Sequence, residues 1–241
     1  MTVLHAISDL HLPGSKQKRM DEDWLVWTDH VERTEKNWKE TVSEEDIVLI
    51  PGDISWALKP LEAQSDLKWL DGLPGRKILL KGNHDYWIPG ITKLQDLLEP
   101  YGSLSYLDRN HFFFELGKRR VGVAGTRAWA SWKQKTSKDE KIIKRELSKL
   151  ETSLDSLPDD LDIKLVMTHF PPTARVLENE AAWPEIFDER FVEMMAENSV
   201  SKAIFGHLHT THNVRVSFSY LKIDFRCVSA DLIDFKPVKL L

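Results

Sequence analysis

The stretch from Arg76 to Asp85 reads RKILLKGNHD, and it joins a short apolar run directly to a group of polar residues. Short runs rich in Ile and Leu that end in Gly or polar residues are typical of buried strands. Gly82 permits a tight turn, and this turn would aim the carbonyl oxygen of Asn83 at a ligand. The stretch therefore predicts a buried strand whose carboxyl end carries metal-binding groups.

Four more apolar runs end in the same way. They are Thr2–Ser8 before Asp9, Asp46–Pro51 before Gly52 and Asp53, Asp162–Thr168 before His169, and Lys202–Phe205 before Gly206 and His207. Between the runs, helical periodicity appears in five segments, which are Met20–Glu40, Leu61–Leu70, Ile91–Leu98, Asp139–Leu157 and Glu185–Glu197. Strands that alternate with helices predict a layered α/β fold. Because such sheets bind ligands at the carboxyl ends of their strands, we expect the five motifs to meet in one site.

Further strands are expected at Phe112–Glu115, Arg120–Ala124, Asn213–Phe218 and Tyr220–Arg226, with a turn near Ser217–Ser219 between the last two. The sequence has no repeats and no low-complexity segment that would mark a linker. We therefore expect one domain over residues 1–241.

Composition restricts the class of protein. The chain has 241 residues and a formal net charge of −5, which lacks the broad basic footprint of a nucleic-acid binder. The single cysteine, Cys227, cannot form an internal disulfide, and a buried apolar role is expected for it. No run reaches the roughly 18 apolar residues that a membrane span needs. We expect a cytoplasmic protein without a membrane partner, and the oligomeric state stays open.

The five motifs supply ligands of one chemical kind. Asp9 and His11 are two residues apart, as are His207 and His209, and on an extended backbone such pairs point to the same side. The carboxylate of Asp53 has two oxygens and can bridge two cations. Each motif alone is common, and His169 alone would be read as a structural residue. Five motifs in one order, all at strand ends, favour a site for two metal ions.

The string D-x-H, G-D, G-N-H-D, H and G-H-x-H resembles the signature of the calcineurin-like metallophosphoesterase superfamily, and it spans most of the chain from Asp9 to His209. The resemblance implies an α/β fold in four layers (α/β/β/α) with two central mixed β-sheets. In many relatives the second motif is G-D-x-x-D, whereas this chain has Trp56 in the last position. Because that carboxylate is usually not a ligand, we expect the metals to be retained and the substrate subgroup to differ.

The resemblance also implies a role for each motif residue. The implied ligands are Asp9, His11 and His209 for the first metal, Asn83, His169 and His207 for the second, and Asp53 as the bridge between them. His84 resembles the histidine that contacts the phosphate and assists the leaving group, and Asp85 is expected to orient it.

The implied reaction is hydrolysis of phosphomonoesters or phosphodiesters of small molecules, by attack of a metal-bridging hydroxide with His84 assisting the leaving group. Imidazole and carboxylate ligands without thiolate suit two divalent or trivalent ions, with Mn preferred over Fe or Zn. A nuclease or nucleotide pyrophosphatase of the same fold is an alternative, and the net charge weighs lightly against a nucleic acid substrate. A scaffold that has lost catalysis is a further alternative, although every motif residue is retained.

Three more residues are candidates for substrate binding. Arg127 follows an apolar run and a Gly, and its planar guanidinium could hold a phosphate. Trp56 and Trp87 lie close in sequence to Asp53 and Asp85, so each could form a substrate wall or brace the metal loops.

Overall fold

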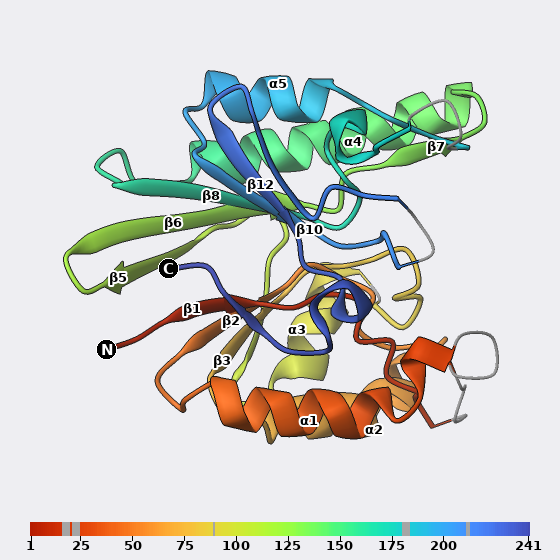
Figure 1. Ribbon diagram of the computed structural model, residues 1–241, viewed down its shortest axis with the longest axis vertical. Helices are drawn as coiled ribbons and strands as arrows, with labels where there is room; N and C mark the ends of the chain where they lie inside the picture. The colour runs from red at the N-terminus through yellow and green to blue at the C-terminus, as the bar shows by residue number, and fades with distance from the viewer. Residues whose placement is uncertain (16–19, 21–24, 89, 180–183, 211–212) are drawn as a thin grey trace.

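The computed structural model describes residues 1–15, 20, 25–88, 90–179, 184–210 and 213–241. Two β-sheets lie between two layers of helices (Figure 1), so the predicted four-layer fold is confirmed. The first sheet has the order β13-β1-β2-β3-β4. Its strands are β13 (Val238–Lys239), β1 (Leu4–Ala6), β2 (Ile47–Ile50), β3 (Arg76–Leu79) and β4 (Leu104–Tyr106).

The second sheet has the order β11-β12-β10-β8-β6-β5. Its strands are β11 (Ser217–Tyr220), β12 (Ile223–Cys227), β10 (Lys202–Phe205), β8 (Ile163–Thr168), β6 (Arg119–Thr126) and β5 (Phe112–Leu116). Both sheets are mixed, because parallel central strands are flanked by antiparallel edges such as β13 and β5. A short pair is formed by β7 (Ala130–Trp132) and β9 (Glu185–Phe187).

The alternation of side chains along the strands of the first sheet builds one apolar layer on each of its faces. In β2, Ile47 and Leu49 pack between the sheets, while Val48 and Ile50 pack toward the helices. Leu165 and Met167 of β8 meet the first pair from the opposite sheet. A strand buried on both faces reads as a continuous apolar run, which explains why these strands show no polar alternation in the sequence.

Helices cover the outer face of each sheet (Figure 1). The helices of the first sheet are α1 (His30–Thr41), α2 (Pro60–Asp71) and α3 (Ile91–Leu98), and those of the second are α4 (Ser137–Asp155) and α5 (Arg190–Glu197). The fully buried Trp38 anchors α1 in the first core. Helix α4 begins with a capping box between Thr136 and Asp139, which satisfies backbone amides of its first turn. In the described part of the chain, none of the helices is long and apolar enough to cross a membrane.

Two expectations about local structure were wrong. Glu185–Phe187 is a strand and not the start of a helix, because its backbone pairs with β7 and the helix begins only at Arg190. Ser217–Ser219 lies within β11, and the turn falls at Leu221 and Lys222, which both have positive φ. The expected helix at Met20–Glu40 begins at His30 after a 3-10 turn at Leu25–Trp27, and residues 21–24 lie outside the described part.

The two sheets meet at the carboxyl ends of their parallel strands. Ser8, just after β1, donates its backbone N–H to the carbonyl of Val228 after β12, at 2.7 Å. Val228 donates in turn to the carbonyl of Phe205 at the end of β10, at 2.8 Å. These bonds fix the end of the first sheet against the end of the second, so segments that follow β1 and β10 lie together. The same edge is far from the chain termini in Figure 1.

Asp188 ties the helical layer above the second sheet to its neighbours. Its carboxylate accepts hydrogen bonds from Arg190 and Lys135, and Arg190 also makes a bidentate contact with Glu140 of α4. Burial tends to raise the pKa of Asp188, but the hydrogen bonds from Arg190 and Lys135 outweigh it and lower the pKa to about 2. The ionised form is therefore stabilised in the folded state.

We predict that Asp188→Asn lowers the free energy of unfolding near neutral pH by up to about 2 kcal/mol, the equivalent of the pKa shift. The folded pKa lies below the ordinary value of 3.8, so this stabilisation is present above 3.8 and is lost as the pH falls toward about 2. Urea unfolding of both proteins across this range measures the difference. Glu193→Gln, an exposed change on α5, serves as control; a gap between Asp188→Asn and the original chain that does not narrow in acid would contradict the account.

Candidate metal centre

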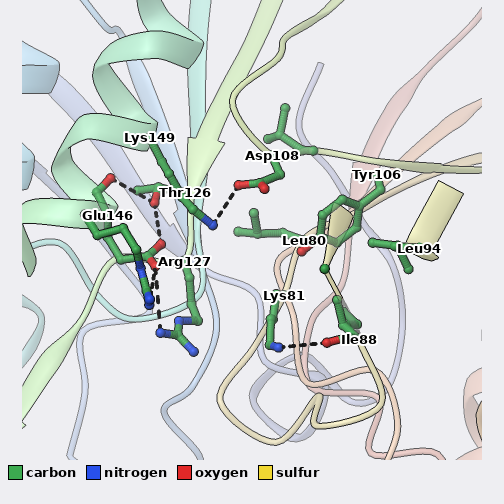
Figure 2. Close-up of a pocket in the computed structure, with 13 residues that line it drawn as sticks. Leu80, Lys81, Ile88, Leu94, Tyr106, Asp108, Thr126, Arg127, Glu146 and Lys149 are labelled. Carbon is green, nitrogen blue, oxygen red and sulfur yellow. Dashed lines mark hydrogen bonds and ion pairs between the residues drawn. The ribbon is translucent and has the colours of Figure 1, made fainter. Parts of the chain in front are cut away.

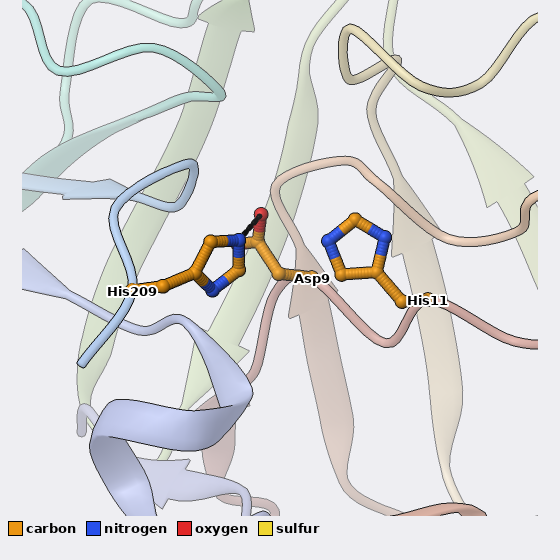
Figure 3. Close-up of side chains that lie close together, drawn as sticks. All are labelled: Asp9, His11 and His209. Atoms are coloured by element: carbon orange, nitrogen blue, oxygen red, sulfur yellow. Dashed lines mark ion pairs between the residues drawn. The ribbon is translucent and has the colours of Figure 1, made fainter. Parts of the chain in front are cut away.

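The first group of predicted ligands is assembled as expected (Figure 3). Asp9 and His11 follow β1, and His209 follows β10 across the junction of the sheets. One ligand atom from each lies within 4.8 Å of the others. The Nε2 atom of His209 is 4.0 Å from Oδ1 of Asp9. These three side chains could hold one metal ion.

Asp53, which follows β2, lies between this group and a second one. Its Oδ2 is 3.8 Å from Nε2 of His11, and its Oδ1 is 3.5 Å from Nε2 of His169. Asp9, Asp53 and His169 also form a group whose ligand atoms lie within 4.8 Å of one another. The two oxygens of one carboxylate therefore face two different sets of donors, which is the arrangement that a bridging ligand requires.

Asn83 completes the second set. Its Oδ1 lies 2.6 Å from Nε2 of His169 and 2.9 Å from Nδ1 of His207. The three residues come from the loops after β3, β8 and β10, so this convergence depends on both sheets. The structure thus brings together all seven residues that the motifs nominated as ligands.

The backbone at Asp9, His11 and His207 is not extended, so the extended conformation that we expected for the D-x-H and H-x-H pairs was wrong. Asp9, His11, Asp53 and His207 all have positive φ, between 45° and 72°. This left-handed conformation is uncommon for residues with a side chain, although Asp and His tolerate it better than most. Four such residues in one site indicate backbone strain that the surrounding structure maintains, as is common at functional sites.

The glycines before the ligands are required by close packing. A Cβ at Gly82 would collide with the carboxylate of Asp53, and a Cβ at Gly206 would collide with the carboxylate of Asp9. A Cβ at Gly52 would lie 2.6 Å from the backbone nitrogen of Gly82. Each G of the G-D, G-N-H-D and G-H-x-H motifs therefore allows one metal loop to press against another.

The carboxylates and imidazoles of the site are buried, and their burial favours the binding of a cation. Asp9, Asp53, His11 and His169 are at most 2% exposed. Burial, followed by the nearby carboxylates of Asp9 and Asp85, raises the pKa of Asp53 well above its ordinary value. Burial, followed by neighbouring histidines, lowers the pKa of His11 and His169 well below theirs. The imidazoles are thus held neutral, which is the form that binds metal.

Two histidines show that a metal fits. Nδ1 of His169 is 2.9 Å from the carbonyl oxygen of Pro51, so it carries the proton and donates. The lone pair of Nε2 is then directed at the oxygens of Asn83 and Asp53, which also present lone pairs. Both ring nitrogens of the buried His11 lack a hydrogen-bond partner among the described residues. One cation bound by Nε2 of His169, Asn83 and Asp53, and a second bound by one ring nitrogen of His11, would compensate these lone pairs.

Residues outside the motifs orient two of the histidines. Nδ1 of His209 is 3.0 Å from Oδ1 of Asp231, and Nε2 of His207 is 2.8 Å from Oε2 of Glu185. Carboxylates in this position fix the orientation of a ligating imidazole. Both were missed in the sequence. Asp231 follows β12, so the pattern of a strand that ends in polar residues could have identified it, whereas no local signal marks Glu185.

His84 lies at the open side of the site. Its Nε2 is 4.0 Å from Oδ2 of Asp53, and its side chain is 36% exposed. Trp56 stacks on His11 at 4.7 Å between ring centroids and lies 4.3 Å from the ring of His84. The residue that replaces the usual carboxylate therefore lies beside both histidines, and its role as a substrate wall stays a prediction.

Asp85 and Trp87 hold the loops after β2 and β3 together from the core side. The fully buried carboxylate of Asp85 accepts hydrogen bonds from the backbone amides of Ile54, Ser55 and Gly82 and from Nε1 of Trp87. These bonds fasten the loop after β2 to the loop after β3. Trp87 is 1% exposed, which favours the second of its two expected roles, a brace for the metal loops, over a substrate wall. An orienting bond from Asp85 to His84 stays a prediction.

Arg127 lies beside the second donor set. Its carbonyl accepts the backbone N–H of His169 at 3.2 Å, and its guanidinium is 3.8 Å from the carboxylate of Glu146. The guanidinium carbon also lies 5.0 Å from the centroid of the Trp129 ring. Arg127 is thus a largely buried cation held next to the centre, and its expected contact with phosphate stays a prediction.

Comparison with known proteins places the chain in a family. The sequence model of the calcineurin-like phosphoesterases matches residues 1–211, which include all five motifs. The chain belongs to this family. A curated relative, the gene 66 protein of Mycobacterium phage D29, is 46% identical over 79 residues, or 32% of this chain. The chain spans only 38% of the length of that relative.

Solved structures share the fold of this calcineurin-like phosphoesterase at low sequence identity. The phosphopantetheinyl hydrolase of Mycobacterium tuberculosis has a TM-score of 0.64 at 14% identity, over 100% of this chain and 96% of that one. A protein from Thermus thermophilus has a TM-score of 0.57 at 13% identity, over 99% of both chains. A protein of unknown function from Aquifex aeolicus has a TM-score of 0.52 at 17% identity, over 99% of this chain and 96% of that one.

We predict that Gly206→Ala weakens Mn²⁺ binding by about tenfold or more, because the added methyl group displaces the carboxylate of Asp9. Titration of the metal-free protein with Mn²⁺, followed calorimetrically, measures the change. Gly102→Ala is the matched control, since no described heavy atom lies within 4 Å of a Cβ there. Equal Mn²⁺ affinity in both variants would show that the close approach of the two loops is not needed for the site.

Proposed function

We propose that this calcineurin-like phosphoesterase is a dinuclear metal-dependent hydrolase of small phosphate esters, either monoesters or diesters. The position of Asp53 carries the proposal, because its two oxygens face the separate donor sets around His11 and His169. Asp9, His11 and His209 would hold one ion, Asn83, His169 and His207 the other, and Asp53 both. Imidazole, amide and carboxylate donors favour Mn, with Fe or Zn as alternatives.

Two bound cations would neutralise the charge of the phosphate and supply an activated water molecule near neutral pH. The chain's own residues would do the rest. Its buried carboxylates and imidazoles exclude bulk water from the metal side, and the strained loops hold the donors in place before the substrate arrives. Preorganised groups of this kind need no rearrangement during the reaction.

His84 is the candidate acid for the leaving group. Its side chain is 36% exposed, whereas those of the four histidines assigned as ligands range from 0% to 14%. A substrate can therefore reach His84 without displacing a ligand. Trp56 packs against the His84 ring and would restrict its rotation while offering a flat surface to the departing group. Arg127, which lies beside the second donor set, would contribute a further positive charge to the site.

The proposal is tested with Mn²⁺-loaded protein and four substrates: p-nitrophenyl phosphate, bis-p-nitrophenyl phosphate, a cyclic nucleotide and single-stranded DNA. We expect hydrolysis of at least one of the small esters and its abolition when chelator removes the metal. Hydrolysis of DNA in preference to all small esters would favour a nuclease. Metal-loaded protein that hydrolyses none of them would contradict the proposal and favour a scaffold.

The same assay tests the proposed role of His84 as the acid for the leaving group. We expect His84→Asn to retain bound metal and to lower kcat by about 100-fold or more, as is typical when a general acid is removed. His111→Asn is the matched control, because His111 lies outside the site and bonds to Ser156. Unchanged kcat in the metal-loaded His84→Asn protein would assign leaving-group assistance to another residue.

A further inference from the structure

A cavity of about 260 Å³ is lined by residues that adjoin the loops of the metal centre. Figure 2 shows its lining. Its walls come from the ends of β3, β4 and β6 and from one face of α4. Lys81 in its wall immediately precedes Gly82 and Asn83, and Arg127 in its wall is bonded through its carbonyl to His169. The cavity is therefore connected through the backbone to two of the proposed ligands, but contains neither.

The lining of the cavity has an excess of positive charge. Four of its side chains are cationic and two are acidic, which leaves an excess of two; they are Lys81, Arg127, Arg145, Lys149, Asp108 and Glu146. Asp108 is 2.8 Å from Lys149. Glu146 is shared, since one of its oxygens lies 3.3 Å from Arg145 and 3.8 Å from Arg127. The acidic side chains thus balance the α4 side of the cavity.

The side nearest the proposed metal site is less fully compensated, because Arg127 shares its carboxylate partner Glu146 with Arg145. The ammonium group of Lys81 donates to the carbonyl oxygen of Ile88 at 3.2 Å, which is a dipole and not a countercharge. The buried Nε of Arg127 has no hydrogen-bond partner among the described residues. Partly buried cations whose charge is incompletely compensated are costly, and an anion bound between Lys81 and Arg127 would offset that cost.

We propose that this cavity is a second anion subsite, which holds a phosphate or carboxylate group on the same substrate whose phosphate ester reaches the metals. The inference rests on the proposed function of the metal centre. It narrows the substrate class to phosphate esters that carry another acidic group within reach of Lys81 and Arg127. Their donors would supply charge-assisted hydrogen bonds to that group.

The test uses alkane diphosphonates of graded chain length, the matching phosphonocarboxylates and the matching monophosphonates, none of which can be hydrolysed. Binding to the Mn²⁺-loaded protein is measured calorimetrically. We expect at least one doubly acidic compound to bind about tenfold more tightly than its monophosphonate, the gain of one charge-assisted hydrogen bond. The phosphonate and carboxylate arms show which acidic group the cavity prefers.

Substitutions test whether the gain in affinity depends on the cavity. Lys81→Met should abolish this gain while monophosphonate binding persists, and Lys81→Arg should restore part of it. Lys118→Met, in the β5–β6 turn, removes the same charge far from the cavity and should change nothing. Arg145→Gln on the more exposed side of α4 leaves the metal loops intact and should reduce the gain more weakly.

The outcomes separate the two proposals. Absence of any gain across the series, with monophosphonates still bound at the metals, would overturn the subsite and leave the metal centre standing. A gain that survives both Lys81→Met and Arg145→Gln would also overturn it, because the second anion would then bind elsewhere. If no phosphonate binds to metal-loaded protein, the proposed function fails and the subsite fails with it.

Discussion

The carboxylate of Asp53 is buried at the junction of two β-sheets, between donors that come from both. Its neighbours are other carboxylates and neutral imidazoles, and burial raises its pKa well above the ordinary range. Bound cations would compensate this concentration of carboxylates and imidazole lone pairs. The proposed binding of cations at this junction would account for the residue types of the site.

The fold supplies the rigidity that such a site needs. Parallel strands from the two sheets end at one edge, and the bonds around Ser8 and Val228 fix those ends together. Left-handed backbone at Asp9, Asp53 and His207, together with the absent side chains of the motif glycines, lets the loops approach within contact distance. Asp85 and Trp87 then brace these loops from the core side. The strain is offset by the large apolar cores on either side of the first sheet.

Much of this could be predicted from the sequence, because buried parallel strands and their polar ends are local patterns. Each strand that carries a motif was placed within about two residues, and the seven candidate ligands converge as expected. The remainder could not be read from local sequence patterns. Glu185 is extended because it pairs with β7, and it faces His207 although no motif surrounds it. Trp87 is a brace because the Asp85 carboxylate accepts its indole N–H, which sequence proximity alone could not distinguish from a substrate wall.

The central claim is that Asp53 joins two metal ions, and metal stoichiometry combined with electron paramagnetic resonance tests it most directly. The account predicts that Mn²⁺-loaded protein contains two ions per chain and shows a spin-coupled spectrum, since bridged ions in such sites are about 3.5–4 Å apart. Asp53→Asn should lose the coupling while Lys118→Met keeps it. A single ion per chain, or two ions without magnetic coupling in the original protein, would contradict the account.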